Sequence, residues 1–239
     1  MFKQSIKKRR YSFSLVFVLS FASLTSLAQE TLNDLTQEIQ IAAKHNSANL
    51  RSKVATYKEN VVITQGNIKI TADEATVYSD LKTDKKTYVL NGKPVKFERI
   101  EEDGFLVSAQ ANIMQYKPGI RLLSVEGDAR LQEKRSLVKG DKIRYNLETK
   151  EVYAKGKPVA FHRTLTDGTP IDILGNDVSY VPESRLVSVE GNAVVRQIGT
   201  EVKGSKMTYN VDTEQLNVDS NSDETVTTII QPKLNKENQ

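Results

Sequence analysis

One stretch of this sequence is written twice, which constrains the fold more than any other feature. RLLSVEGDARL (121–131) returns as RLVSVEGNAVV (185–195), 64 residues later. Three more stretches return at the same interval: NGKPVKFERIEEDG as KGKPVAFHRTLTDG, ANIMQY as GNDVSY, and KGDKIRY as KGSKMTY. A copied unit of this length predicts stacked structural units, each of which needs its neighbours to complete its apolar core.

Each 64-residue unit is itself made of two related halves. A small residue placed five positions before a tyrosine recurs at Ala111, Gly140, Gly175 and Gly204, with steps of 29, 35 and 29 residues. Regular coils of a parallel β-helix would need even steps. The uneven steps favour strands that return antiparallel to one another.

Within the units the apolar residues alternate with a period of two. Val95 and Phe97 alternate with Lys96 and Glu98, and glycine, proline, Asn and Asp recur between such runs. This pattern is typical of strands with one buried and one solvated face. It predicts an all-β domain whose first and last strands have unpaired edges, open to pairing with another chain.

If the sheet folds over on itself, the apolar faces line one interior that an acyl chain could occupy. Each methylene buried there would contribute roughly 0.8 kcal/mol. Plain core packing is the alternative for each residue. The positions expected to face inward are Ile39, Ile41, Ile68, Ile70, Val95, Phe97, Met114, Ile143, Tyr145, Phe161, Val178, Met207 and Tyr209.

The N-terminus has the layout of a cleaved signal peptide over residues 1–28. Five basic residues precede an apolar stretch that ends in Ser26-Leu27-Ala28, with small residues at the −1 and −3 positions. A membrane anchor is the alternative, but this stretch is short and interrupted by serines. We expect residues 29–37 to be flexible, residues 38–230 to form the β domain, and residues 231–239 to be a disordered tail.

Composition excludes several classes of function. The chain has 34 basic and 30 acidic residues, and five of the basic ones lie in the leader, so the remainder carries 29 basic and 30 acidic residues. A basic surface for nucleic acid is therefore not indicated. The sequence contains no cysteine, which excludes disulfides and thiol chemistry.

No pattern of catalytic or metal-binding residues stands out. The two histidines, His45 and His162, read as surface positions, and no HExxH, glycine-rich phosphate loop or catalytic triad motif is present. We therefore expect no enzyme activity, no cofactor and no metal.

The ordered set of motifs resembles the OstA-like family of periplasmic lipopolysaccharide-transport proteins. The matching pieces are VVITQGNIKITAD (61–73), GKPVKF (92–97), VEGDA, VEGNA, KGDKIRY (139–145) and VTTIIQP (226–232), in the family's order. The resemblance implies an elongated, twisted, open β-jellyroll with an apolar trough, exported to the periplasm. The family pattern has one fewer 64-residue unit, so a duplication is inferred here.

The resemblance also implies a ligand and partners. Lipopolysaccharide would lie with its acyl chains in the trough, and the chain would stack head to tail with itself, with LptC at the inner membrane and with LptD at the outer membrane. The residues implied to line the trough are Ile39, Phe97 and Met114, with Phe161 as a duplicated counterpart. Lys142, Arg144, Lys203 and Lys206 are candidates for headgroup contact, although simple solvation is the commoner role of such residues.

Two other functions remain open at this stage. One is a structural or adhesive β-solenoid that binds protein or glycan without lipid. The other is a membrane-linked relative such as LptC or the plug domain of LptD, which the cleavable leader disfavours.

Overall fold

The computed structural model describes residues 36–220 and 225–230. The expected signal peptide, residues 29–35 and the tail at 231–239 lie outside this part of the chain. Among the described residues, no helix is long and apolar enough to cross a membrane.

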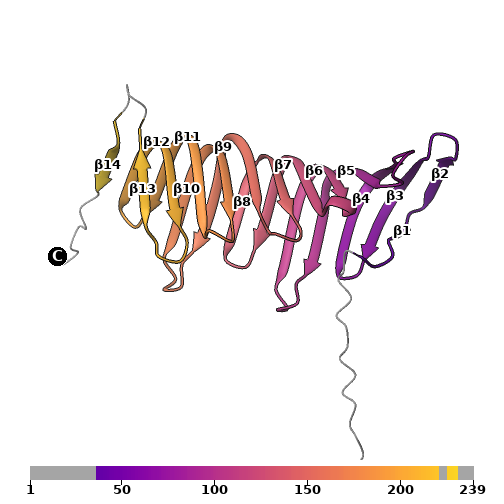
Figure 1. The fold of residues 1–239 in the computed structure, drawn as a ribbon, viewed down its shortest axis with the longest axis horizontal. Helices are drawn as coiled ribbons and strands as arrows, with labels where there is room; N and C mark the ends of the chain where they lie inside the picture. Colours follow the sequence, from indigo (N-terminus) through magenta and orange to yellow (C-terminus); the bar gives the residue numbers. More distant parts are fainter. Residues whose placement is uncertain (1–35, 221–224, 231–239) are drawn as a thin grey trace, which may run out of the picture. The chain divides into compact units, whose positions relative to one another are not determined.

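The described chain is built almost entirely of β-strands, which run antiparallel to their neighbours, and the long strands pair in chain order (Figure 1). The all-β, antiparallel prediction is confirmed. The strands are β1 (Gln40–Ala42), β2 (His45–Asn49), β3 (Val54–Gln65), β4 (Ile68–Ser79), β5 (Lys86–Ile100), β6 (Leu106–Lys117), β7 (Leu122–Glu133), β8 (Ser136–Asn146), β9 (Val152–Thr164), β10 (Pro170–Val181), β11 (Leu186–Gln197), β12 (Thr200–Asn210), β13 (Leu216–Asp219) and β14 (Thr227–Ile230). A 3₁₀ turn, η2 (Pro118–Ile120), separates β6 from β7.

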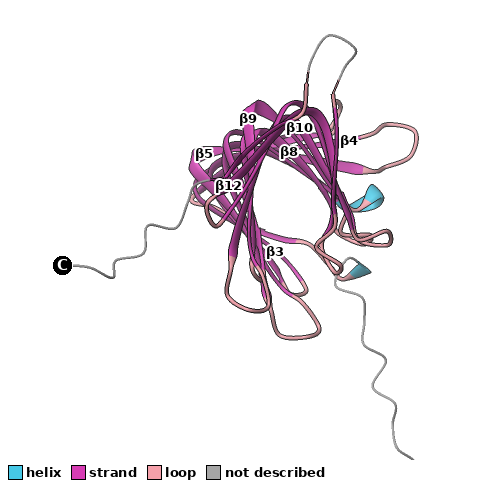
Figure 2. Cartoon of the chain, turned by 90° about the vertical axis from the view of Figure 1, so that its left-hand side faces the viewer, coloured by secondary structure: helices cyan, strands magenta, loops and turns pink. Residues whose placement is uncertain are grey.

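Most of the long strands bend near their middle, where the pairing register shifts. In β4 the buried residues are Ile68, Ile70 and Ala72 before the shift and Ala75 and Val77 after it, so the inward alternation changes parity at the bend. A bulge of this kind turns a strand sharply while keeping its apolar side chains on one face. The sheet therefore curls so that the two halves of its strands face each other across an apolar interior (Figure 2).

The glycine of the duplicated VEG phrase lies at one such bend. Gly127 and Asp128 have φ values of 78° and 48°, and their copies Gly191 and Asn192 have 73° and 52°. The register shifts across each pair, between Glu126 and Ala129 in the first copy. Left-handed backbone is adopted most readily by Gly, Asn and Asp. The repeated VEG phrase in the sequence therefore marks a bend that recurs in the strands.

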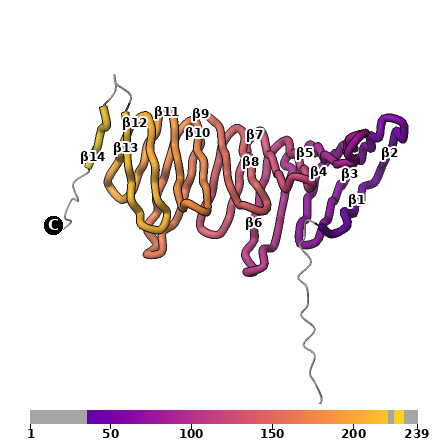
Figure 3. Tube along the Cα trace, in the orientation of Figure 1, coloured from indigo at the N-terminus to yellow at the C-terminus, as the bar shows by residue number. Residues whose placement is uncertain are grey.

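At each end of the sheet, two short strands share the last long one (Figure 3). β1 pairs with the second half of β3 and β2 with its first half. At the other end β13 pairs with the second half of β12 and β14 with its first half. β2 and β14 are exposed along their whole length, so each end of the sheet presents strand edges to solvent.

Candidate ligand-binding interior

Nearly all the side chains expected to face inward do so. Ile39 and Ile41, at the start of the domain, are half-buried. The others are at most 4% exposed: Ile68, Ile70, Val95, Phe97, Met114, Ile143, Tyr145, Phe161, Val178, Met207 and Tyr209. The interior is thus apolar from the first strands to the last. Contact of these residues with lipid stays a prediction.

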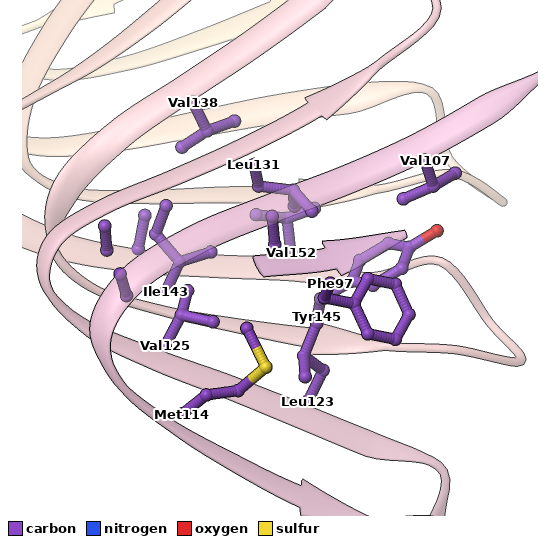
Figure 4. Close-up of a cluster of buried hydrophobic side chains, with 14 of the residues drawn as sticks. Phe97, Val107, Met114, Leu123, Val125, Leu131, Val138, Ile143, Tyr145 and Val152 are labelled. Carbon is purple, nitrogen blue, oxygen red and sulfur yellow. The ribbon is translucent and has the colours of Figure 1, made fainter. Parts of the chain in front are cut away.

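In the middle of the sheet the interior is filled by its own side chains (Figure 4). Phe97 of β5, Met114 of β6, Val125 of β7 and Ile143 of β8 pack together, and each is at most 2% exposed. An acyl chain could pass here only if these side chains moved apart. Methionine is the side chain most easily rearranged in this way, because it is unbranched and flexible.

Open space adjoins the interior at both ends of the sheet. At the β1–β2 end a groove of about 410 Å³ is lined by Ile39, Ile41, Tyr57, Val77 and Tyr88, with lysines near it. At the β13 end a smaller groove of about 270 Å³ is lined mainly by the apolar residues Val195, Ile198, Val202 and Leu216. The larger groove has the size of an ordinary small-molecule site. It includes two residues of the predicted site, Ile39 and Ile41.

A third opening lies at the side of the folded sheet, where turns from its two facing halves approach each other. We call this 310 Å³ opening the side window. Its apolar lining comes mainly from Leu131, Val138, Val152 and Phe161. Its charged lining comes from Glu133, Lys134, Arg135, Lys150, Arg163, Arg185 and Asp212.

Next to the side window, the two halves of the folded sheet are joined by a cluster of charged residues, which we call the seam cluster: Arg99, Glu101 and Lys150. Arg99 Nη1 lies 3.3 Å from Glu101 Oε1 and donates to the Leu147 carbonyl at 2.7 Å. Lys150 Nζ lies 3.0 Å from Glu101 Oε2. The Glu101 residue is only 8% exposed. These contacts tie the end of β5 to the turn between β8 and β9.

Burial shifts the pKa of two further ionisable groups near the seam cluster. Burial raises the pKa of the Glu133 carboxyl above its ordinary value. Burial also strongly raises the pKa of the Tyr145 hydroxyl, which has no hydrogen-bond partner among the described residues. The Tyr116 hydroxyl, by contrast, donates to Gln65 Oε1 and so links the far end of β6 to the end of β3.

The four basic residues suggested for headgroup contact lie on the outer face of the sheet. Lys142 is paired with Glu126 at 3.1 Å, Lys206 with Glu190 at 2.9 Å and Lys203 with Glu201 at 2.7 Å. Arg144 is also exposed. Carboxylates already balance the charge of these three lysines, from the neighbouring strand for Lys142 and Lys206 and from the same strand for Lys203.

Sequence reasoning missed the charged residues of the seam and the side window. The signal was present, because Arg99 continues the inward alternation of Val95 and Phe97, and Arg163 continues that of Val159 and Phe161. A basic residue at an inward position of a strand calls for a partner or a ligand.

The family model for "LptA/(LptD N-terminal domain) LPS transport protein" matches residues 40–151 and again residues 148–215. The chain belongs to this family. The resemblance seen in the sequence is confirmed, and the double match agrees with the duplication inferred from the 64-residue repeat.

Named relatives are similar over part of the chain. The lipopolysaccharide export system protein LptA of Escherichia coli K12 is 32% identical over 157 residues, which are 64% of this chain and 85% of the relative. The protein of the same name from Haemophilus influenzae is 29% identical over 144 residues, 59% of this chain and 84% of the relative. A crystal structure of LptH from Pseudomonas aeruginosa, 26% identical, aligns with a TM-score of 0.49 over 52% of this chain and 85% of that one.

Proposed function

We propose that this lipopolysaccharide-transport protein is a periplasmic bridge subunit that binds lipopolysaccharide by its acyl chains in the interior of the folded sheet. The observation that carries the proposal is the apolar interior, continuous from β3 to β12 and adjoined by open grooves at both ends. A conduit requires this arrangement, because a ligand passed from one subunit to the next must enter at one end and leave at the other.

The expected free energy of binding an acyl chain suits a protein that passes its ligand on. A 12-carbon acyl chain fully removed from water would contribute about 9 kcal/mol. Much of this gain would be spent on separating the packed side chains in the middle of the interior, such as Phe97 and Met114. The net affinity per chain is therefore modest, which allows the lipid to be passed on.

The role proposed is binding and transfer, with no chemical step. The relatives are named as export system proteins. The adhesive-solenoid alternative receives less support, because a β-solenoid would be built of regular parallel coils, whereas the sheet of this chain is antiparallel.

Site-specific photocrosslinking in living cells tests lipid binding. A photoreactive residue at Phe97 or Phe161 is expected to give a lipopolysaccharide adduct, because both side chains point inward. The matched controls are the next residues, Lys96 and His162, which are exposed on the outer face. Equal adducts at inward and outward positions, or none at the inward ones, would refute the proposal.

We further propose that subunits join end to end through the exposed strand edges, with copies of this chain and with LptC-like and LptD-like partners. Edges of this kind recruit further strands through main-chain hydrogen bonds. Size-exclusion chromatography with light scattering should show a concentration-dependent series of sizes.

Proline substitutions in β14 test the edge. Successive residues of a strand direct their N–H groups to opposite sides, so Thr228→Pro and Ile229→Pro remove N–H groups from opposite edges. The variant that loses an N–H on the free edge should keep the fold and abolish the series of sizes. The variant that loses an N–H facing β12 should weaken the pairing of β14 with β12. If neither changes the series, assembly does not use this edge.

A further inference from the structure

The lining of the side window carries more positive than negative charge. Five basic residues face two acidic ones in it. Lys134 is paired with Asp103 at 2.7 Å, and Arg185 Nε lies 3.4 Å from Asp212. Lys150 is held by Glu101 in the seam cluster. Two arginines, Arg135 and Arg163, remain.

Within the described chain, neither of these two arginines has a carboxylate partner. Arg135 Nη1 donates to the Leu165 carbonyl at 3.2 Å, and Arg163 Nη1 donates to Ser136 Oγ at 3.1 Å. Arg163 Nε is buried and has no hydrogen-bond partner. The two lie close together, because Arg163 pairs across the sheet with Ser136, the neighbour of Arg135. Arg163 is partly buried and Arg135 is exposed at the mouth of the window, and guanidinium groups without a carboxylate partner favour an anion.

The duplication shows how this charge became uncompensated. Arg163 is the copy of Arg99, 64 residues later, but the copy of Glu101 is Leu165. In the first unit the carboxylate closes the seam onto its arginine. In the second unit the arginine is kept while its carboxylate is replaced by an apolar residue, and the side window lies beside it.

We propose that the side window binds the phosphate group of a phosphorylated lipid, with Arg135 and Arg163 holding the phosphate and Phe161, Val138 and Val152 receiving the start of an acyl chain. This inference rests on the proposed function and adds where the polar part of the lipid is held. Guanidinium groups suit it because their planar donors match phosphate oxygens in pairs. The apolar and cationic groups meet at one opening, as an amphipathic anion requires.

The test compares two lipid probes on the purified full chain. Lipid A with two phosphates and its fully dephosphorylated form are titrated in the same detergent. The wild type should bind the phosphorylated form about tenfold more tightly, as expected for one or two charge-assisted hydrogen bonds. The double variant R135Q/R163Q should bind both forms equally. The control R51Q/R130Q removes two exposed arginines that do not line the window and should keep the preference.

Further arms separate the possible outcomes. The variant R135K/R163K keeps both positive charges, so it should fold if charge alone maintains the site. It should keep only part of the preference for phosphorylated lipid A, because lysine lacks the planar, forked set of donors of arginine. Unchanged preference in R135Q/R163Q would overturn the inference while leaving the proposed function intact. Failure of the wild type to bind either lipid would overturn both. Binding of inorganic phosphate alone, lost in R135Q/R163Q with no effect on lipid preference, would assign the arginines to free phosphate and overturn the lipid site.

Discussion

At the scale of single residues, the bends of the strands depend on positions where a side chain has no room. A Cβ atom on Gly175 in β10 would lie 2.3 Å from Val189 Cγ1 of the neighbouring strand. We therefore expect Gly175→Ala to lower the free energy of unfolding by about 1–3 kcal/mol, the usual cost of overpacking. Urea denaturation measures it.

The matched control is Gly119→Ala in η2, where the added Cβ would meet only Lys85 side-chain carbons at 3.7 Å. Its effect should stay within about 0.5 kcal/mol, or be slightly stabilising through the unfolded state. Equal effects of the two substitutions would show that close packing at the bend is not what requires glycine.

Glu133 gives a prediction about pH. Burial is the main cause of its raised pKa; Lys150 and Lys134 oppose the shift, while Glu101 and Asp103 add to it. A carboxyl with a raised folded-state pKa disfavours folding once it must ionise. This loss of stability is absent at a pH below the pKa of Glu133 in the unfolded chain. It grows as the pH rises from that value through the higher pKa of the folded protein, and it is complete above the folded pKa. Glu133→Gln should therefore raise the melting temperature at pH 8 and leave it unchanged at pH 4. Stabilisation that is the same at both pH values would contradict this.

At the scale of elements, the seam cluster holds the two halves of the first unit together. Glu101→Gln would remove a carboxylate that contacts the largely buried Arg99 side chain, and removing one partner of a buried ion pair costs about 3–5 kcal/mol. We expect a loss at the lower end of this range in urea denaturation, because Lys150 is partly exposed. Binding of an apolar fluorescent dye should also rise, because the interior becomes accessible at the seam.

The control for the seam is Glu148→Gln, which breaks the exposed pair between Glu148 and Arg121 at 2.9 Å. Exposed pairs contribute at most about 1 kcal/mol, so this variant should be nearly neutral and should not increase dye binding. If both variants behave alike, the seam cluster is no more than a surface ion pair.

The elements also show which features could be predicted from the sequence. Local alternation was enough to place Val95 and Phe97 in the interior, because side-chain direction within a strand depends only on its neighbours. An inward arginine at position 99 could be predicted, but its partners could not, because the pairing of Glu101 with Lys150 joins residues from different turns and depends on how the sheet curls. The headgroup suggestion for Lys142 was made without its cross-strand partner Glu126, which only the strand register reveals.

At the scale of the whole sheet, each long strand contacts chiefly the strands before and after it. Stability in such an arrangement is approximately a sum over neighbouring units. The duplication therefore lengthens the interior without requiring a new fold, and the two copies are free to differ at single positions, as Glu101 and Leu165 do. The chain can gain a side window in one unit while the other stays closed.

This additivity predicts that one copy can be removed. Deleting residues 124–187 joins Leu123 to Ser188, which keeps the alternation because Leu123 and Val189 both point inward. The shortened chain should unfold in a single cooperative transition, with a urea m-value lower by about a third in proportion to the surface lost. The control deletion, 124–186, removes one residue fewer and joins Leu123 to Val187. It turns every interior side chain of the following half-strand outward and should prevent folding, because a one-residue slip reverses both faces of a strand. If the two deletions fold equally well, the 64-residue unit is not the structural repeat.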